Sequence, residues 1–246
     1  MEFLQAIDHR PYPLSRAPYV MSQAWRNLLF AHWRIDPAIL QALLPEPLEI
    51  DTFDGSAWLG VVPFRMCDVR GRFMPMAFNF LELNVRTYVK YGDRKGVFFF
   101  SLDADHPLSV WGARTFYGLP YFNADMRYGE SKGLIHYASD RLVANQKAAN
   151  FQAVYESVAP AQIAQPATLE HFLTERYCLL TVSNGKVDRT DIHHAPWKLS
   201  PARALISVNT MAEPLGIQLS TEPDSVLYSH EISMVAWMPA REILNR

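Results

Sequence analysis

The feature that most constrains this chain is a series of ten short runs rich in β-branched and aromatic residues, separated by turn signals. Runs of this length and composition are typical of β-strands. Asn184-Gly185 is a strong signal for a two-residue hairpin, whereas Tyr91-Gly92-Asp93 and Tyr128-Gly129-Glu130 are weaker turn signals. The predicted strands are Arg26–Ile35, Ala57–Met66, Phe80–Tyr91, Val97–Leu102, Leu134–Ala138, Phe151–Val158, Arg176–Val182, Lys186–His193, Ala204–Val208 and Ser229–Trp237.

Helix signals are few and short. Asp36-Pro37 predicts the start of a helix over Ala38–Leu44, and a second is predicted from Pro107 to a C-terminal glycine cap at Gly118. A third is predicted over Thr168–Leu173. Because strands and helices do not alternate, the pattern favours an antiparallel barrel or sandwich over a βαβ fold. The pattern does not change along the chain, so residues 1–246 are predicted to form a single domain, with Ala159–Pro166 as a connector.

Charge and hydropathy exclude several classes of protein. Hydrophobic residues make up 49% of the chain and charged residues 20%, which excludes a largely disordered protein. The net charge is −2, so nothing in the balance calls for nucleic acid or an anionic membrane. No apolar run approaches the ~20 residues that span a bilayer, and the N-terminus lacks the apolar stretch of a signal peptide. We expect a soluble, cytoplasmic protein without nucleic-acid or membrane partners.

Sequence signatures for nucleotides, zinc hydrolases, α/β-hydrolases and calcium are absent. Cys67 and Cys178 are interpreted as reduced, packed thiols. His193-His194 is the strongest metal candidate, but adjacent strand residues point to opposite faces, so at most one of them can serve a shared site. Zinc normally needs three or four protein ligands. We therefore predict no metal and no cofactor.

Asp103, Asp105 and His106 form a second polar cluster, at the end of a predicted strand and before the Pro107 helix. They could place a carboxylate and an imidazole at the mouth of a pocket. Alternatively, they serve a turn and a helix N-cap, where such side chains accept backbone N–H bonds. The second interpretation is favoured, because a cap is required at this position.

One predicted strand has a polar face. Glu82 and Arg86 lie four residues apart and share a face with Phe80, Asn84 and Tyr88, while the residues between them are mostly apolar. The apolar face must pack on something. The polar-aromatic face is either solvated or lines a hydrophilic cavity, and periodicity alone leaves both open.

Arg26 and Arg34 are eight residues apart in a largely apolar strand, and even spacing places them on the same side. A buried guanidinium needs a carboxylate partner or an anionic ligand. The sequence leaves these two interpretations equally open.

Several strings resemble a known superfamily. LEIDTFDGSAWLGVVPFRM (Leu48–Met66), ELNVRTYV (Glu82–Val89), GARTFYGLPYF (Gly112–Phe122) and IHHAPW (Ile192–Trp197) resemble the YqjF-like bacterial proteins, a branch of the acetoacetate decarboxylase-like superfamily. LLPEPLEID (Leu43–Asp51) and SHEISMVAWMPAREI (Ser229–Ile243) resemble acetoacetate decarboxylase itself. The resemblance covers nearly the whole chain. It implies a mainly β (α+β) protein: a single antiparallel acetoacetate decarboxylase-like β-barrel with an interior cavity and a few short outer helices.

The same resemblance implies an altered site. The decarboxylase forms an imine through one of two adjacent lysines, and the matching positions here are Tyr121 and Phe122, which cannot form one. Arg26 matches the arginine associated with the substrate carboxylate, and Glu82 matches a carboxylate of the cavity. A second cavity acid falls near Trp58 or Leu59 and is missing. The lysines lie elsewhere, at Lys90, Lys95, Lys132, Lys147, Lys186 and Lys198.

These residues imply a barrel that binds a small, anionic organic acid or keto acid and is not an acetoacetate decarboxylase. Arg26 is expected to bind the anion. An alternative is a lysine-independent lyase, hydrolase or isomerase that uses Glu82 and Tyr121 as acid and base, with Arg26 stabilising the anion. A third interpretation is a non-catalytic relative whose cavity is filled by side chains. The sequence leaves open whether the protein forms a homo-oligomer. The expected ligand-binding residues are Arg26, Glu82, Arg114, Tyr117, Tyr121 and Phe122.

Overall fold

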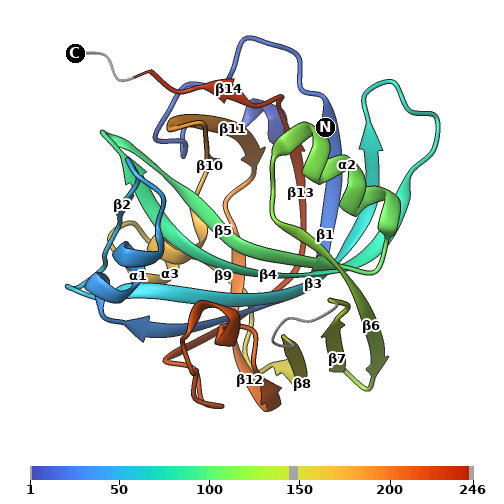
Figure 1. The fold of residues 1–246 in the computed structure, drawn as a ribbon. Helices are drawn as coiled ribbons and strands as arrows, with labels where there is room; N and C mark the ends of the chain where they lie inside the picture. Colours follow the sequence, from blue (N-terminus) through green and yellow to red (C-terminus); the bar gives the residue numbers. More distant parts are fainter. Residues whose placement is uncertain (1, 144–148, 244–246) are drawn as a thin grey trace.

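The computed structural model describes residues 2–143 and 149–243, and its main strands join in one sheet (Figure 1). All ten predicted strands and all three predicted helices are present. The helices are η1 (Glu2–Gln5), α1 (Pro37–Leu43), α2 (Pro107–Tyr117), α3 (Leu169–Thr174) and η2 (Glu213–Leu215). The strands are β1 (Met21–Ile35), β2 (Glu49–Ile50), β3 (Ala57–Gly71), β4 (Phe78–Tyr91), β5 (Arg94–Ala104), β6 (Tyr121–Ser131), β7 (Leu134–Arg141), β8 (Asn150–Ser157), β9 (Gln162–Ile163), β10 (Cys178–Ser183), β11 (Lys186–His194), β12 (Lys198–Asn209), β13 (Ser225–Ala236) and β14 (Ala240–Arg241).

The sheet closes on itself in two rings. The first ring runs β13–β1–β3–β4–β5–β10–β11 and returns to β13. The second ring leaves β5 through β6, β7, β8 and β12 and also returns to β13. In Figure 1, β10 and β11 lie above the shared strands β3, β4 and β5, whereas β6, β7, β8 and β12 lie below them. Among the described strands, only β5–β6 and β5–β10 pair in parallel. The predicted closed, sheet-dominated fold is therefore confirmed, in the form of two rings with a common wall.

Each shared strand contributes to two interiors, because successive side chains of a strand point to opposite faces. On β4, Phe80 and Tyr88 pack in an apolar cluster on the side of the first ring, together with Phe64. The odd-numbered Leu83 and Val85 pack in a separate cluster on the side of the second ring. A single strand thus contributes to both cores: its even-numbered residues face the first ring and its odd-numbered residues face the second.

A bulge at Asn27 shifts this parity on β1. Arg26 pairs with Arg65 of β3, but Ala31 pairs with Val61, so β1 carries one extra residue between the two pairs. Asn27 has a φ of 55°, a conformation that Asn tolerates better than most residues. Its side chain is buried: Nδ2 donates to Tyr128 Oη over 2.5 Å, and Oδ1 accepts from Tyr228 Oη over 2.6 Å.

The bulge overturns one prediction. After it, Arg34 pairs with Trp58, an even-numbered β3 residue, whereas Arg26 pairs with the odd-numbered Arg65. Arg26 and Arg34 therefore lie on opposite faces of the sheet, and the prediction that they share a side is wrong. Even spacing along the sequence holds only in a strand without an inserted residue.

The turns agree with the sequence in most places. Asn184 and Gly185 both have positive φ, 53° and 68°, which confirms the predicted hairpin between β10 and β11. Gly118 ends α2 in the left-handed conformation, as predicted. The turn predicted at Tyr128-Gly129-Glu130 is wrong, because these residues lie within β6, and the chain turns instead at Lys132-Gly133. No helix in the described ranges is both long and apolar enough to cross a membrane.

Candidate functional site

A row of polar side chains faces the interior of the first ring. Glu82, Asn84, Arg86 and Tyr88 alternate along β4 with residues of the second-ring core, and none is more than 6% exposed. Tyr88 belongs to the apolar cluster of the first ring, and strand alternation places the other three on the same face. Of the two interpretations left open for this polar face, the solvated one is wrong. We call these four residues the β4 row.

One end of the β4 row is the Glu82–Tyr121 pair. The Tyr121 hydroxyl donates to Glu82 Oε2 over 2.6 Å, and both side chains are buried. Tyr121 is the first residue of β6, and residues 118–120 separate it from the end of α2. The Arg114 side chain of α2 fixes this junction, since its Nε donates to the Tyr121 carbonyl over 2.5 Å. The structure therefore brings together two residues that are far apart in the sequence and that were both predicted as site residues.

The electrostatics of this pair suit proton exchange. Burial raises the pKa of Glu82 to about 7, with the negative charge of Asp103 acting in the same direction and hydrogen bonds with Tyr121 and Asn84 opposing the rise. Burial and the charge of Glu82 hold the pKa of Tyr121 well above 10. A carboxyl group with a pKa close to neutrality can both give and accept a proton at physiological pH.

The other end of the β4 row is built around Tyr88 and Arg86. The Tyr88 hydroxyl donates to the Leu173 carbonyl over 2.7 Å and lies 2.7 Å from His32 Nε2. Arg86 Nη2 donates to the same Leu173 carbonyl over 3.3 Å. Burial and the charge of Arg86 hold the pKa of His32 well below 6.5, so the imidazole is neutral.

A glycine makes room for this end. Gly60 pairs with His32 on one side and with Arg86 on the other. A Cβ atom on Gly60 would lie 2.7 Å from His32 Nε2 and 3.4 Å from Arg86 Cγ. The absence of a side chain at position 60 thus lets the imidazole and the guanidinium stem sit next to each other.

His32 and Arg86 were not predicted as site residues. The alternation of polar residues along β4 did place Arg86 on the same face as Glu82, which is the signal that could have identified it. His32 carried no signal, since it lies in an apolar run and its parity depends on the Asn27 bulge.

Arg26 does not reach this interior. It pairs with Glu231 over 3.1 Å, and both side chains are 41% exposed. Its neighbour across the sheet is Arg65, whereas Glu82 is the neighbour of Phe64, so Arg26 and Glu82 lie on opposite faces. The expectation that Arg26 and Glu82 reach one cavity is therefore wrong.

The other predicted ligand-binding residues lie near the Glu82–Tyr121 pair, but their side chains do not join it in the ring interior. Arg114 is exposed, and Tyr117 is half-buried, which raises its pKa. Phe122 pairs with Asp103 and points away from Tyr121, with the Arg141 guanidinium 4.3 Å from its ring centre. Of the six predicted ligand-binding residues, the structure joins only Glu82 and Tyr121 in the ring interior.

The Asp103–Asp105–His106 cluster has local roles. Asp103 forms a buried ion pair with Arg141, with 2.7 Å between Oδ1 and Nε, and burial raises its pKa to about 6 against the effect of Arg141. Asp105 Oδ1 accepts from the Leu81 backbone N–H. His106 is the N-cap of α2 and accepts from Ser109 N–H. The predicted cap role is confirmed, with histidine rather than aspartate as the cap.

The two adjacent histidines are both buried and have separate partners. His193 Nε2 contacts the Phe3 carbonyl, and His194 Nδ1 contacts the Ala195 carbonyl. Burial lowers the pKa of His193 to about 4. In the described ranges, no three His, Cys, Asp or Glu side chains are grouped to hold a metal. Cys67 and Cys178 are free and buried, as predicted.

No described lysine is buried. Lys90 pairs with Glu49 and Lys95 with Asp51 near the ends of strands. Lys147 lies outside the described residues. The exposed ones are Lys95, Lys132, Lys186 and Lys198.

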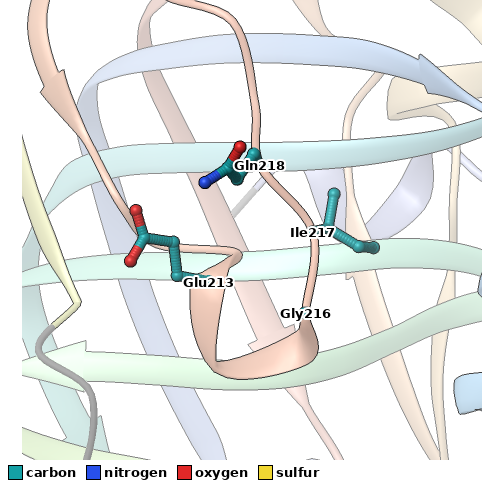
Figure 2. Close-up of a pocket in the computed structure, with 4 residues that line it drawn as sticks. All are labelled: Glu213, Gly216, Ile217 and Gln218. Atoms are coloured by element: carbon teal, nitrogen blue, oxygen red, sulfur yellow. The ribbon is translucent and has the colours of Figure 1, made fainter.

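Two pockets open on the outer surface. One, of about 380 Å³, is formed at the end of η2 by Glu213, Gly216, Ile217 and Gln218 (Figure 2). The other, of about 290 Å³, lies between the segment around β9 and the start of α3. Predicted site residues line neither pocket. The residues that line the second include Leu199 and Leu227, which also belong to the apolar cluster of the first ring.

Comparison with known proteins agrees with this architecture. A family profile described as DUF2071, uncharacterized conserved protein, matches residues 22–233. The chain is 45% identical over 227 residues to the uncharacterized protein YqjF of Bacillus subtilis, with 91% of this chain and 93% of that protein covered. Acetoacetate decarboxylase from Legionella pneumophila superposes with a TM-score of 0.62 at 16% identity, covering 98% and 95% of the two chains. The enduracididine biosynthesis enzyme MppR, in complex with pyruvate, superposes with a TM-score of 0.60 at 11% identity, covering 92% of each chain.

Proposed function

Because the chain belongs to the DUF2071 family and has the acetoacetate decarboxylase-like fold, we propose that it binds a small organic acid or keto acid inside the first ring. The observation that carries this proposal is the buried β4 row, which ends at the Glu82–Tyr121 pair. Buried polar groups without full compensation cost about 1–3 kcal/mol each. We expect an interior that only packs the fold to have apolar side chains at these positions. The β4 row therefore argues against a non-catalytic relative whose cavity is filled by side chains.

The chemistry of the surroundings supports a small ligand. A few polar groups among apolar and aromatic side chains are the usual composition of a small-molecule site. Aromatic members of the first-ring cluster include Phe30, Phe64 and Trp197. MppR, which has this fold, is complexed with pyruvate, a keto acid.

The second surface pocket supports a route of entry. Leu199 and Leu227 line it and also belong to the apolar cluster of the first ring. It is also lined by residues of the predicted connector Ala159–Pro166 and by Thr168 and Glu170 at α3. Displacement of this short segment would open the pocket toward the ring interior.

A thermal-shift screen of short-chain acids and keto acids tests the proposal. A ligand at ten times its dissociation constant stabilises the native state by about 1.4 kcal/mol, which for a chain of this size raises Tm by roughly 2–4 °C. Tyr121→Phe should reduce this shift, whereas Tyr117→Phe, a change in a half-buried tyrosine outside the β4 row, should leave it intact. If no acid raises Tm, or if both variants respond like the wild type, the proposal is wrong.

A second function is supported by the proton chemistry of the pair. With a pKa of about 7, Glu82 could act as general acid or base on a bound keto acid, with Tyr121 as proton donor, in a lyase, hydrolase or isomerase reaction. Arg26 has no part in this proposal. Proton NMR of each acid that binds would report turnover, and Glu82→Gln should reduce the rate about 100-fold or more while binding persists. Unchanged turnover in this variant would exclude the role of Glu82.

We also propose that no imine forms. An imine requires an amine within ~3–3.5 Å of the reacting carbonyl, and the position after the Gly112–Pro120 segment is Tyr121. The protein is incubated with acetoacetate and borohydride and its intact mass is measured. We expect no adduct; an adduct mapped to one lysine, with release of carbon dioxide, would contradict this.

A further inference from the structure

Among the described arginines, Arg86, Arg141 and Arg176 are almost fully buried, and two of them face a carboxylate. Arg141, 5% exposed, pairs with Asp103 over 2.7 Å. Arg176, 6% exposed, pairs with Asp51 over 2.8 Å. These two follow the general rule that a charge is buried together with its counter-charge, because desolvation of an unpaired ion costs several kcal/mol.

Arg86 is the exception. It is equally buried, but no carboxylate of the described chain lies within 4 Å of it. Its Nη2 donates to the Leu173 carbonyl over 3.3 Å, and its buried Nε has no partner among the described residues. Its guanidinium carbon lies 5.2 Å from the ring centre of Phe30 and 5.7 Å from that of Tyr88. Aromatic faces attract a cation, but they do not neutralise it.

Further hydrogen-bond donors in the same interior lack partners. The indole N–H groups of Trp58 and Trp197 are buried without an acceptor in the described chain, and both rings belong to the first-ring cluster. Trp197 packs edge-on against Phe30, the ring that also lies beside Arg86, with 5.0 Å between the ring centres. Trp58 lies on β3 two residues before Gly60, the partner of Arg86. Unused donors and an unpaired positive charge call for an acceptor that carries negative charge.

The inference that follows rests on the proposed function. We propose that Arg86 binds the carboxylate of the ligand, so that the protein takes a small monocarboxylic acid whose other end points along β4 toward Glu82 and Tyr121. A guanidinium binds a planar carboxylate through two parallel N–H···O bonds. One guanidinium compensates one negative charge, which favours a monocarboxylate over a phosphate ester or a dicarboxylate. The apolar rings around it favour a short, uncharged body attached to that carboxylate.

Binding of paired acids and amides tests this assignment. The probes are pyruvate, benzoate and phenylacetate, each measured beside its primary amide by quenching of tryptophan fluorescence. We expect at least one acid to bind the wild type at least tenfold more tightly than its amide. Arg86→Gln should weaken that acid at least tenfold and bring the acid-to-amide ratio within twofold of one. Arg26→Gln, which removes an exposed guanidinium, should leave the ratio unchanged.

Each outcome separates the two proposals. If acids and amides bind the wild type equally, or if Arg86→Gln keeps the preference, the carboxylate assignment is wrong although an interior ligand remains. If sodium chloride competes as well as any acid, the site holds an adventitious ion only, and the assignment is again wrong. If no probe binds, the proposed function fails.

The role of Arg86 can also be measured without a ligand. Arg86→Met keeps an unbranched side chain and removes the unpaired charge, so we expect the unliganded variant to have a Tm equal to or above that of the wild type. Arg176→Met, which removes the buried partner of Asp51 and leaves it only the exposed Lys95, should lower Tm. If Arg86→Met lowers Tm as much as Arg176→Met does, Arg86 serves the fold and the proposal is overturned.

Discussion

Replacing Glu82 by glutamine should change how the stability of this protein depends on pH. Burial raises the pKa of Glu82 from 4.5 to about 7 in the folded state. Between these values the folded protein holds a proton that the unfolded chain has lost, so its contribution to stability is full below pH 4.5 and is lost as pH rises through 7. A shift of this size corresponds to about 3 kcal/mol, at 1.36 kcal/mol for each unit of pKa. Glutamine cannot titrate, so this part of the pH dependence disappears in the variant.

Urea unfolding at pH 4.5 and at pH 8.5, followed by tryptophan fluorescence, measures the effect. The wild type should lose about 3 kcal/mol of stability between the two pH values that Glu82→Gln does not lose. The free energy of unfolding of the variant minus that of the wild type should therefore rise by about 3 kcal/mol from pH 4.5 to pH 8.5. Asp103, whose pKa is also raised, is present in both proteins, so the desolvation that dominates its own titration is common to both curves. Glu231→Gln, a change in an exposed carboxylate, should vary by less than about 0.5 kcal/mol. A difference for Glu82→Gln that stays constant with pH would refute the reasoning, since it would mean that the carboxyl group is solvated or has a cationic partner.

Three further substitutions test the packing. Gly60→Ala would place a Cβ 2.7 Å from His32 Nε2, so it should lower the free energy of unfolding, measured in urea, by about 1–3 kcal/mol. The control is Gly129→Ala, at a strand glycine with no contact below 4.0 Å, which should change this free energy by less than about 0.5 kcal/mol. Equal effects of the two substitutions would contradict the close approach at Gly60. Asn27→Ala should cost about 3 kcal/mol through lost hydrogen bonds and a strained φ, and Asn27→Gly should recover roughly 1 kcal/mol of it, so no recovery would locate the whole effect in the hydrogen bonds. Asp103→Asn should cost about 3–5 kcal/mol by leaving a buried guanidinium unpaired, and a change in Tm within 1 °C would show that this ion pair is not needed.

The sequence predicts the strands of this protein better than it predicts their faces. Alternation along β4 separates two sets of side chains correctly, because that strand carries no inserted residue. The bulge at Asn27 has no comparable signal: a single asparagine in an apolar run does not reveal that it adopts a positive φ. β6 was missed because its outward residues, Asn123, Asp125 and Arg127, are polar and because Gly129 suggests a turn.

The site was predictable to the extent that residues on one strand face the same way. Glu82 and Tyr121 were identified from the resemblance, and the fold joins them. The prediction that Arg26 reaches the interior is wrong for a physical reason. The number of residues between two positions does not determine which face of the sheet each side chain takes when a bulge lies between them. Alternation along β4 places Arg86 on the face of Glu82, but the burial of its charge without a carboxylate partner is a property of the folded chain alone.

The wall shared by the two rings has a consequence for how proteins of this family can diverge. Five positions on β4, namely 80, 82, 84, 86 and 88, face the interior of the first ring, and the residues between them face the core of the second ring. Substitutions at the even positions can therefore change the side chains that face the first ring while the core of the second ring keeps its composition. A single-residue deletion within β4 would instead exchange the two sets and place charges in the apolar core. Lineages of such a fold should accordingly accumulate length changes in their hairpin turns and exchange side chains, but not residues, along the common wall. Because of the same separation, a small library of variants randomised at these five positions is suited to selection for binding of new ligands.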